Sequence, residues 1–377
     1  MINTPTPRKK WLIFIYSMSS GGAERVTANL ANYWARKGWD ITVVTLASRD
    51  LDFYPLHPTI KRVTLALAGD SKNALVGLKQ NLYRVLALRQ ILRQIQPDIA
   101  LGMMTGANVL LALAALGLSN LCTVGSERTH PPQVPLGYLW ERLRCYTYRL
   151  LNAVTVLTSE SEDWIKSNTY AQKVSMIPNA VFYPLLAQEP RVNPNNTERK
   201  RLLAVGRLSE EKRFSDLIET FSNLAAKHPH WDLVILGEGA LRSELEQQIR
   251  ALALEKRIFL MGRVGNVGEW YESADLYVMS SRFEGFPNTL IEAMSYGLAA
   301  ISFDCDTGPR DIIRHEIDGL LVPAGNIVAL TAALDRLMSD EELRLRLAKR
   351  AIEVRERFSI EKITQLWEQL FDEVGKK

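Results

Sequence analysis

The sequence predicts two doubly wound α/β domains in tandem, joined by a short linker. The chain has 377 residues, which is more than one hydrophobic core usually supports. In both halves, apolar segments of strand length alternate with segments of helical period, the pattern of parallel sheets covered by helices. A polar, proline-containing segment at 188–200 interrupts this alternation and is therefore the predicted linker.

The elements follow in order along each domain. In the first domain, 1–187, we expect strand 11–16, helix 23–37, strand 41–46, helix 75–94, strand 99–104, helix 107–116 and strand 122–125. In the second, 201–357, we expect strand 201–205, helix 214–226, strand 231–236, helix 241–251, strands 258–261 and 276–279, helix 288–296 and strand 299–303. A last helix within 358–377 is expected to pack back toward the N-terminal domain. Ligands bind beyond the carboxyl ends of strands in such sheets, so a cleft between the domains is the expected site.

Composition fits a globular protein of a reducing compartment, with 47% hydrophobic and 23% charged residues. Three scattered cysteines, Cys122, Cys145 and Cys305, form neither a zinc motif nor a disulfide framework. The basic run 8–10 is followed by only a short apolar strand, which does not fit a secretory signal. We therefore expect a cytoplasmic protein.

One uncharged segment, 99–118, is long enough to span a bilayer. Gly102, Thr105, Gly106 and Asn108 interrupt it near its middle. A buried strand followed by a buried helix explains its apolarity better than membrane insertion, because strands of parallel sheets are covered on both faces.

Charge is unevenly distributed between the halves. Residues 1–190 hold 20 Lys/Arg and 12 Asp/Glu, a net charge of +8, which leaves −4 for residues 191–377. A basic N-terminal half suits a phosphate-bearing substrate, an anionic membrane surface or a nucleic acid, although a merely solvated surface is also consistent. Nucleic acid is the least favoured partner, because the cations are not interleaved with aromatic residues and no recognition motif appears.

The helix expected at 75–94 carries a loose basic stripe beside an apolar one. Its cations are Lys79, Arg84, Arg89 and Arg93. Their steps of five, five and four residues shift each cation only part of the way around a helix of 3.6 residues per turn. Such a stripe suits a lipid diphosphate or anionic lipid. A solvated helix face is the alternative.

Two loops expected at carboxyl ends of strands carry residues suited to phosphate. Gly21-Gly22 stands at a helix start, where a backbone N–H can approach an anion without a Cβ in the way. In the second domain, Arg207 and Lys212 follow the first strand, and two cations on one loop can converge on a diphosphate. Solvated surface cations are the alternative. Gly237-Glu238-Gly239 follows the next strand on the same rim.

The most informative segment holds two carboxylates, Glu284 and Glu292, around a Gly/Pro turn that enters a helix. A helix N-terminus presents N–H groups and a positive dipole end to an anion. Glu284 would lie on the approach loop and Glu292 about one and a half turns into the helix. One carboxylate can then meet the sugar and the other the ribose of a nucleotide-sugar. An ordinary loop–helix junction is the alternative.

Together these motifs resemble the family 4 retaining glycosyltransferases of GT-B fold, two Rossmann-like domains facing across a cleft. The resemblance rests on Gly21-Gly22-Ala-Glu, Gly206-Arg207 with Lys212, Leu236-Gly-Glu-Gly239, Ala274-Asp275-Leu276, Glu284-Gly-Phe-Pro with Glu292-Ala-Met, and Gly308-Pro-Arg-Asp-Ile-Ile313. Within the family the chain looks most like bacterial enzymes that extend polyprenyl-diphosphate-linked glycans, in a subgroup similar to N-acetylgalactosaminyltransferases.

The resemblance implies roles for matching positions. Arg207 and Lys212 would hold the donor diphosphate, Glu292 the ribose hydroxyls, and Gly22 the distal phosphate through its N–H. Gly262, Arg263 and Val264 would contact the base. The donor sugar would lie against Glu284 and the segment after it, Gly285, Phe286, Pro287, Asn288, Thr289 and Leu290.

The resemblance also implies a mechanism that retains the anomeric configuration, in which the departing phosphate takes the acceptor proton. No protein nucleophile is then required, in agreement with the lack of a Ser/His/Asp set. The donor is expected to be a UDP-sugar, carrying N-acetylgalactosamine or another hexose or N-acetylhexosamine, and no cofactor is expected. Asp304-Cys-Asp306 resembles a metal-binding carboxylate pair, but a capped strand end is the better interpretation, so no metal is predicted.

One loop departs from the family pattern. Many relatives place a histidine soon after the strand at 122–125, where this chain has Glu127, Arg128 and His130. Three interpretations are open. His130 takes the role of that histidine from a shifted position, Glu127 and Arg128 replace it in contacting the acceptor, or His130 has a structural role only. We assign no catalytic base.

The expected acceptor is a lipid-linked glycan for cell-surface polysaccharide or glycoprotein glycan assembly, reached from the inner face of the cytoplasmic membrane. Lys79 and Arg84 are candidate acceptor contacts, and no obligate protein partner is inferred. Transfer to a soluble acceptor, or a non-transferring nucleotide-sugar binder or epimerase of the same fold, remain alternatives.

Overall fold

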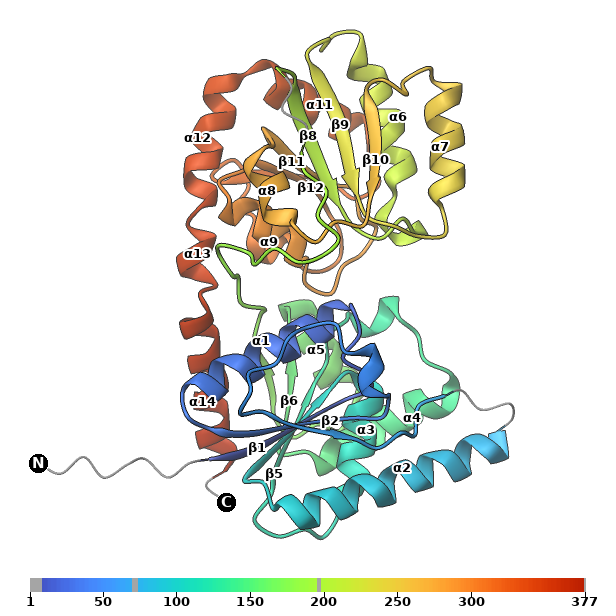
Figure 1. Ribbon diagram of the computed structural model, residues 1–377, viewed down its shortest axis with the longest axis vertical. Coiled ribbons are helices and arrows are strands. Elements are labelled where there is room, and N and C mark those ends of the chain that lie inside the picture. Colours follow the sequence, from blue (N-terminus) through green and yellow to red (C-terminus); the bar gives the residue numbers. More distant parts are fainter. Residues whose placement is uncertain (1–8, 70–73, 195–197, 376–377) are drawn as a thin grey trace, which may run out of the picture. The chain divides into compact units, whose positions relative to one another are not determined.

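The computed structural model describes residues 9–69, 74–194 and 198–375. The chain forms two compact units, one of residues 1–179 with 363–377 and the other of residues 180–362. Each unit contains one parallel sheet with its own helices (Figure 1). The first unit ends earlier than the segment 188–200, and Gln188 already donates its N–H to Gly265 O within the second unit at 2.9 Å.

The first unit holds a seven-stranded sheet in the order β3-β2-β1-β4-β5-β6-β7. Its strands are β1 (Lys10–Ile15), β2 (Asp40–Thr45), β3 (Lys61–Thr64), β4 (Ile99–Met103), β5 (Cys122–Ser126), β6 (Ala153–Val156) and β7 (Val174–Met176). Its helices are α1 (Gly22–Arg36), α2 (Ala74–Ile95), α3 (Thr105–Ala114), α4 (Tyr138–Thr147), α5 (Ser159–Asn168) and, from Ile363 on, α14 (Ile360–Val374), with short turns η1 (Arg49–Leu51), η2 (Pro131–Gln133) and η3 (Tyr148–Leu150).

The second unit holds a six-stranded sheet in the order β10-β9-β8-β11-β12-β13. Its strands are β8 (Lys200–Val205), β9 (Trp231–Leu236), β10 (Ile258–Gly262), β11 (Leu276–Met279), β12 (Ala300–Asp304) and β13 (Gly319–Pro323). Its helices are α6 (Phe214–Ala225), α7 (Arg242–Ala251), α8 (Val267–Glu272), α9 (Asn288–Ser295), α10 (Pro309–Ile312), α11 (Ile327–Ser339), α12 (Glu341–Ala351) and α13 (Val354–Arg357), with the turn η4 (Glu210–Lys212).

These sheets confirm the predicted fold class. The ladders between these strands are all parallel, from Trp11 with Ile41 in the first sheet to Leu202 with Leu233 in the second. Strands β3, β6, β7 and β13, which the pattern did not indicate, complete the sheets. Three of them have only three or four residues, too short for a clear alternation of apolar and polar side chains.

Strand β1 shows how the first sheet is covered on both faces. Leu12 and Phe14 are buried in the cluster that includes Leu88 of α2 and Leu110 of α3. Trp11 contacts the other side, with ring centroids 4.3 Å from Trp34 of α1 and 4.2 Å from Phe371 of α14. Burial of successive residues explains why β1 reads as one continuous apolar run.

The uncharged segment 99–118 forms β4 and α3, as predicted, and Ile99 to Met103 are all buried. Across the helices that the structure describes, none combines the length and the apolarity that crossing a bilayer requires.

Candidate active site

The topology of the second sheet determines which loops meet. Strand β8 has β9 on one side and β11 on the other, so the chain order reverses between β8 and β11. Loops that leave neighbouring strands at such a switch point form the ligand crevice of doubly wound sheets. The two loops here are 206–213 after β8 and 280–287 after β11, which carry Lys212 and Glu284.

Backbone hydrogen bonds link the loop after β8 to the end of β9, and the loop after β9 to the end of β10. Gly206 N–H donates to Leu236 O at 2.9 Å, and Leu208 N–H donates to Glu238 O at 3.0 Å. Gly237 N–H donates to Gly262 O at 2.8 Å. Three consecutive strand ends are therefore fixed to one another, which gives the loop of Arg207 and Lys212 a rigid base.

Lys212 and Glu284 form an ion pair, with Lys212 Nζ 2.6 Å from Glu284 Oε1. Both side chains are largely buried, at 19% and 12% exposure. Ser281 Oγ donates to the same carboxylate oxygen at 2.7 Å, and Ser280 Oγ donates to Lys212 O at 2.8 Å. Thr307, from the loop after β12, donates its hydroxyl to Glu284 O. The predicted cation and the predicted carboxylate thus meet directly, as one charge-balanced pair.

The turn after Glu284 leads into α9, which begins at Asn288 after Pro287. Gly285, Phe286, Pro287, Asn288, Thr289 and Leu290 form this turn and the first helical turn. Gly308 packs against it with φ +94°, where a Cβ would lie 2.6 Å from Pro287 Cδ, so only glycine fits. Among the described residues, no side chain provides an N-cap hydrogen bond at this helix start, and backbone N–H groups at a helix N-terminus are suited to receive an anion.

Glu292 is the fifth residue of α9 and is only 6% exposed. Tyr271 Oη lies 3.3 Å from Glu292 Oε2 and 3.3 Å from Thr289 O. Tyr277 Oη donates to Thr289 Oγ1 at 2.9 Å. Burial, with the nearby charges of Glu284 and Glu292, raises the pKa of Tyr277, so this phenol remains a hydrogen-bond donor at any working pH.

The other predicted donor contacts lie on neighbouring loops. Arg207 is exposed one residue after Gly206, on the loop that carries Lys212. Gly262 is buried at the end of β10, and Arg263 is exposed just beyond it, followed by a half-buried Val264. All are at carboxyl ends of strands in the second sheet, as the motif order predicts.

The Asp304-Cys-Asp306 triplet lies at the end of β12, where Asp304 accepts from Arg310 Nε at 2.9 Å. Across residues 9–69, 74–194 and 198–375, no three His, Cys, Asp or Glu side chains gather in a way that could hold a metal ion.

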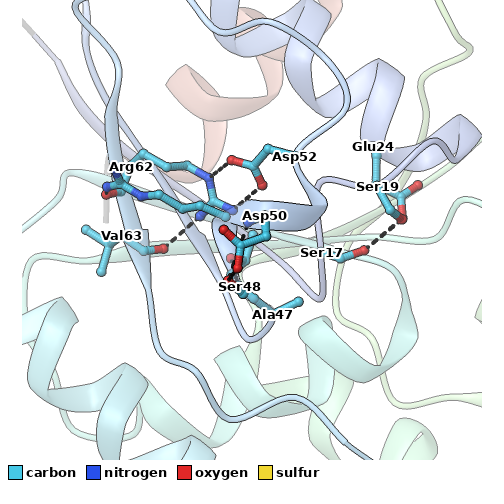
Figure 2. Close-up of polar contacts among 11 residues, drawn as sticks. Ser17, Ser19, Glu24, Ala47, Ser48, Asp50, Asp52, Arg62 and Val63 are labelled. Carbon is cyan, nitrogen blue, oxygen red and sulfur yellow. Dashed lines mark hydrogen bonds and ion pairs between the residues drawn. The ribbon is translucent and has the colours of Figure 1, made fainter.

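In the first unit, the predicted glycine pair stands at the start of α1 with a carboxylate beside it. Glu24 Oε1 lies 3.4 Å from both Ser17 Oγ and Ser19 Oγ, and Figure 2 shows the three side chains together. A Cβ at Gly21 would lie 2.0 Å from Glu24 Oε2, so the glycine permits this close approach. Gly22 is exposed at the first position of the helix. The neighbouring loop is held by Arg62, which donates to both oxygens of Asp52 at 2.8 and 2.7 Å (Figure 2).

Glu127 directly follows β5 and is buried, with 1% exposure. Thr105 Oγ1 donates to its carboxylate at 2.8 Å from Oε2, and Tyr148 donates its hydroxyl to Oε1. Desolvation by burial raises the pKa of Glu127, although the Tyr148 hydrogen bond and the charge of Arg144 oppose that shift.

Arg128 and His130 are also buried rather than open to solvent. Arg128 donates to Ser126 Oγ at 3.3 Å and to Asn179, and burial lowers its pKa to about 9. His130 Nδ1 lies 2.9 Å from Ser161 Oγ, so the ring is held by α5. Glu127, Arg128 and His130 all lie just beyond the carboxyl end of β5, but each has its own polar partners within the first unit.

Helix α2 differs from the expected basic stripe. Arg84 donates to Leu67 O at 2.9 Å and to Gly69 O at 2.7 Å, and Arg89 donates to Ala114 O at 2.8 Å. These two cations hold loops of their own unit, while Lys79 is exposed beside Tyr83. The helix instead exposes large apolar side chains, here called the α2 apolar strip: Leu78 67%, Leu82 57%, Tyr83 54% and Leu86 52%.

Sequence reasoning did not find the residues that position these groups. Tyr271, Tyr277, Ser281 and Thr307 come from four separate elements or loops. Ser281 contacts Glu284 within one loop, three residues away, whereas the two tyrosines and Thr307 reach Thr289, Glu292 or Glu284 only through the tertiary fold. The one available signal was Tyr277, a polar hydroxyl within an otherwise apolar strand.

This fold and site define a transferase of GT-B architecture, and comparison with known proteins agrees. The model of Glycosyltransferase Family 4 matches residues 20–182, and that of Glycosyl transferases group 1 matches residues 187–354. Because the two matches follow one another over most of the chain, the protein belongs to the family 4 glycosyltransferases and is a glycosyltransferase.

Named relatives span nearly the full length. The chain is 28% identical to the amylovoran biosynthesis glycosyltransferase of Erwinia amylovora, over 96% of this chain and 99% of that protein. It is 26% identical to an α-1,4-N-acetyl-D-galactosaminyltransferase of Campylobacter jejuni whose name gives a PP-undecaprenol-linked glycan as substrate, over 96% and 97% of the two chains. An Anabaena protein solved with UDP-glucose superposes with a TM-score of 0.77 at 18% identity, over 97% and 99%, and supports the fold.

Proposed function

We propose that the protein is a retaining glycosyltransferase that moves a hexose or N-acetylhexosamine, such as N-acetylgalactosamine, from a UDP-sugar to a polyprenyl-diphosphate-linked glycan. The observation that carries the proposal is the Lys212–Glu284 pair beside the uncapped start of α9. A cation, a carboxylate and a helix N-terminus together match the three parts of a sugar diphosphate: phosphate charge, sugar hydroxyls and phosphate oxygens.

In this proposal Lys212 has two partners in the donor complex. Its ammonium carries three donors, so it can keep its bond to Glu284 and also donate to a diphosphate oxygen. Arg207, exposed on the same loop, would add a planar fork to the diphosphate. Glu284 would accept from hydroxyls of the donor sugar, and Glu292 from hydroxyls of the ribose.

The proposed reaction needs no covalent intermediate with the protein. The bond between the sugar C1 and the β-phosphate oxygen breaks, and the acceptor hydroxyl oxygen bonds to C1 on the same face. The acceptor proton passes to the departing phosphate oxygen, so UDP leaves and the anomeric configuration is kept. The protein's contribution is charge placed in advance where negative charge grows on the leaving diphosphate.

The acceptor part of the proposal rests on relatives and on the surface of the first unit. Two Campylobacter jejuni relatives, at 26% identity each, are named for undecaprenol-linked glycans. Helix α2 contains cations but no carboxylate, and the α2 apolar strip is exposed. An amphipathic helix of this kind suits an anionic membrane surface. We therefore propose a peripheral location on the inner face of the cytoplasmic membrane.

The test is direct transfer. The protein is incubated with a panel of nucleotide-sugars and a short polyprenyl-diphosphate glycan, and products are weighed by mass spectrometry. We expect a mass gain of one or more sugars with a UDP-sugar, and NMR of the product should show the donor's anomeric configuration. Inverted configuration would exclude the retaining mechanism. The same glycan without its lipid is the second arm, and transfer to that form alone would move the assignment to a soluble acceptor. UDP-sugar binding without transfer to either form would exclude the proposed acceptor.

A further inference from the structure

Two buried tyrosines lie near the start of α9, and one of them contacts Glu292. Tyr271 belongs to α8 and Tyr277 to β11, and both are fully buried. Their rings lie 6.2 Å apart at 66°, and Tyr271 also packs 5.5 Å from Tyr296. The rings therefore have little freedom, and their hydroxyl groups are held at fixed positions near the start of α9.

Each hydroxyl acts on a different group of α9. Tyr271 Oη is within 3.3 Å of Glu292 Oε2 and of Thr289 O, which places it between the carboxylate and the first helical turn. Tyr277 Oη donates to Thr289 Oγ1 at 2.9 Å. One phenol thus contacts the carboxylate itself, and the other fixes the side chain one helical turn before it.

A buried carboxylate that must bind two hydroxyls needs a fixed orientation. A glutamate side chain has several rotatable bonds, and ordering them costs free energy at the moment of binding unless the protein has already done so. A phenol that bonds one carboxylate oxygen restricts rotation and occupies only one of the roughly four lone-pair sites of an ionised carboxylate.

We infer that Tyr271 is a positioning residue, which orients the Glu292 carboxylate for the ribose of the donor and so sets the preference for a ribose with both hydroxyl groups. This inference rests on the proposed role of Glu292. Tyr277 supports the same arrangement through Thr289. Neither tyrosine touches the reacting atoms.

The test compares Tyr271→Phe with the wild type by calorimetry, using UDP, 2′-deoxy-UDP and 3′-deoxy-UDP. The substitution removes the hydroxyl and keeps the ring that packs against Tyr296. Because hydrogen bonds to charged groups are among the stronger ones, we expect UDP binding to weaken by roughly tenfold. Binding of the deoxy analogues should change less, so discrimination against them falls.

Tyr296→Phe is the matched control. Its hydroxyl belongs to the same cluster but accepts from Leu185 N–H at 2.8 Å. Discrimination against the deoxy analogues should stay at the wild-type level, and thermal unfolding of both variants reports on folding. Equal loss of discrimination in both tyrosine variants would overturn the inference, because it would indicate general loosening of the cluster.

A double-mutant cycle separates the inference from the function on which it rests. If Tyr271 acts through Glu292, adding Tyr271→Phe to Glu292→Ala should leave the affinity for UDP unchanged. The same fold-loss in both backgrounds would overturn the positioning role and leave the ribose role of Glu292 intact. Wild-type UDP affinity in Glu292→Ala alone would instead overturn the ribose role itself, and the inference with it.

Discussion

Two glutamates that follow parallel strands, Glu284 in one unit and Glu127 in the other, have opposite surroundings. Glu284 pairs with the cation Lys212 and keeps 12% of its side chain exposed. Glu127 has 1% exposure and is held by the neutral hydroxyls of Thr105 and Tyr148. A carboxylate that is paired with a cation and keeps part of its surface exposed can take a further hydrogen bond from a ligand. Glu127, whose carboxylate is buried and bonded to two hydroxyls, has little surface to offer a ligand. This environment fits a structural role better than acceptor binding.

The largest effect on activity is expected when the cation of the Lys212–Glu284 pair is removed. Lys212→Ala should lower kcat/KM by on the order of a hundredfold or more, as for other preorganised electrostatic groups. Arg207→Ala should act in the same direction. Steady-state kinetics with the identified donor measures both.

Lys227→Ala is the control for that experiment, since Lys227 also forms an ion pair, 2.7 Å from Asp335, but at an exposed position in the same unit. Its turnover should be near normal, because exposed pairs contribute little. Full activity in Lys212→Ala would remove the diphosphate role from this residue.

The second prediction separates the proposed roles of Glu284 and Glu292. Glu292→Ala should weaken UDP binding by roughly tenfold or more, because hydrogen bonds to a charged group are lost. Glu284→Ala should leave UDP binding nearly unchanged but lower turnover of the intact UDP-sugar. Calorimetry with UDP and kinetics with the sugar donor distinguish them, and the reverse pattern would exchange the two roles.

The third prediction concerns the α2 apolar strip. Leu82→Gln together with Lys79→Glu should reduce sedimentation with anionic liposomes several-fold, because apolar contact and electrostatic attraction both fall. Acceptor KM should rise while UDP affinity is retained. Arg84 is left intact in this test, since it holds the carbonyls of Leu67 and Gly69.

Leu345→Gln provides the comparison for the liposome experiment, because Leu345 is an equally exposed helical leucine, at 61%, in the other unit. Unchanged liposome binding in the α2 double variant would leave the membrane proposal without support from this helix.

The smallest effect is expected at Glu127. Its pKa is raised by burial, so the folded state holds this proton more tightly than the unfolded chain. That contribution favours the fold at low pH and is lost as pH rises from the ordinary value of 4.5 toward the raised pKa. Unfolding free energies measured across this range should show the wild type losing stability relative to Glu127→Gln. Parallel pH profiles would mean that the carboxyl titrates normally.

The sequence predicted side-chain positions in the second unit better than in the first. Lys212 and Glu284 could be assigned to one rim because both follow strands of one parallel sheet, and topology brings such loops together. The contact of Tyr271 with Glu292 could not be predicted, since it depends on how α8 packs against α9. The α2 stripe was misjudged for a related reason: Arg84 and Arg89 fold onto backbone carbonyls, a choice that helical periodicity does not reveal.

Because most of α14 belongs to the first unit, the two units cannot both be expressed as single continuous fragments. Phe371 packs on Trp11, and Trp34 Nε1 donates to Glu368 at 3.2 Å. The second unit is one uninterrupted stretch of chain, 180–362, whereas the first is assembled from both ends. A gene fragment can therefore encode the entire second unit, but none that stops before residue 363 encodes the whole of the first. Such a fragment would leave Trp11 and Trp34 without the helix that packs on them.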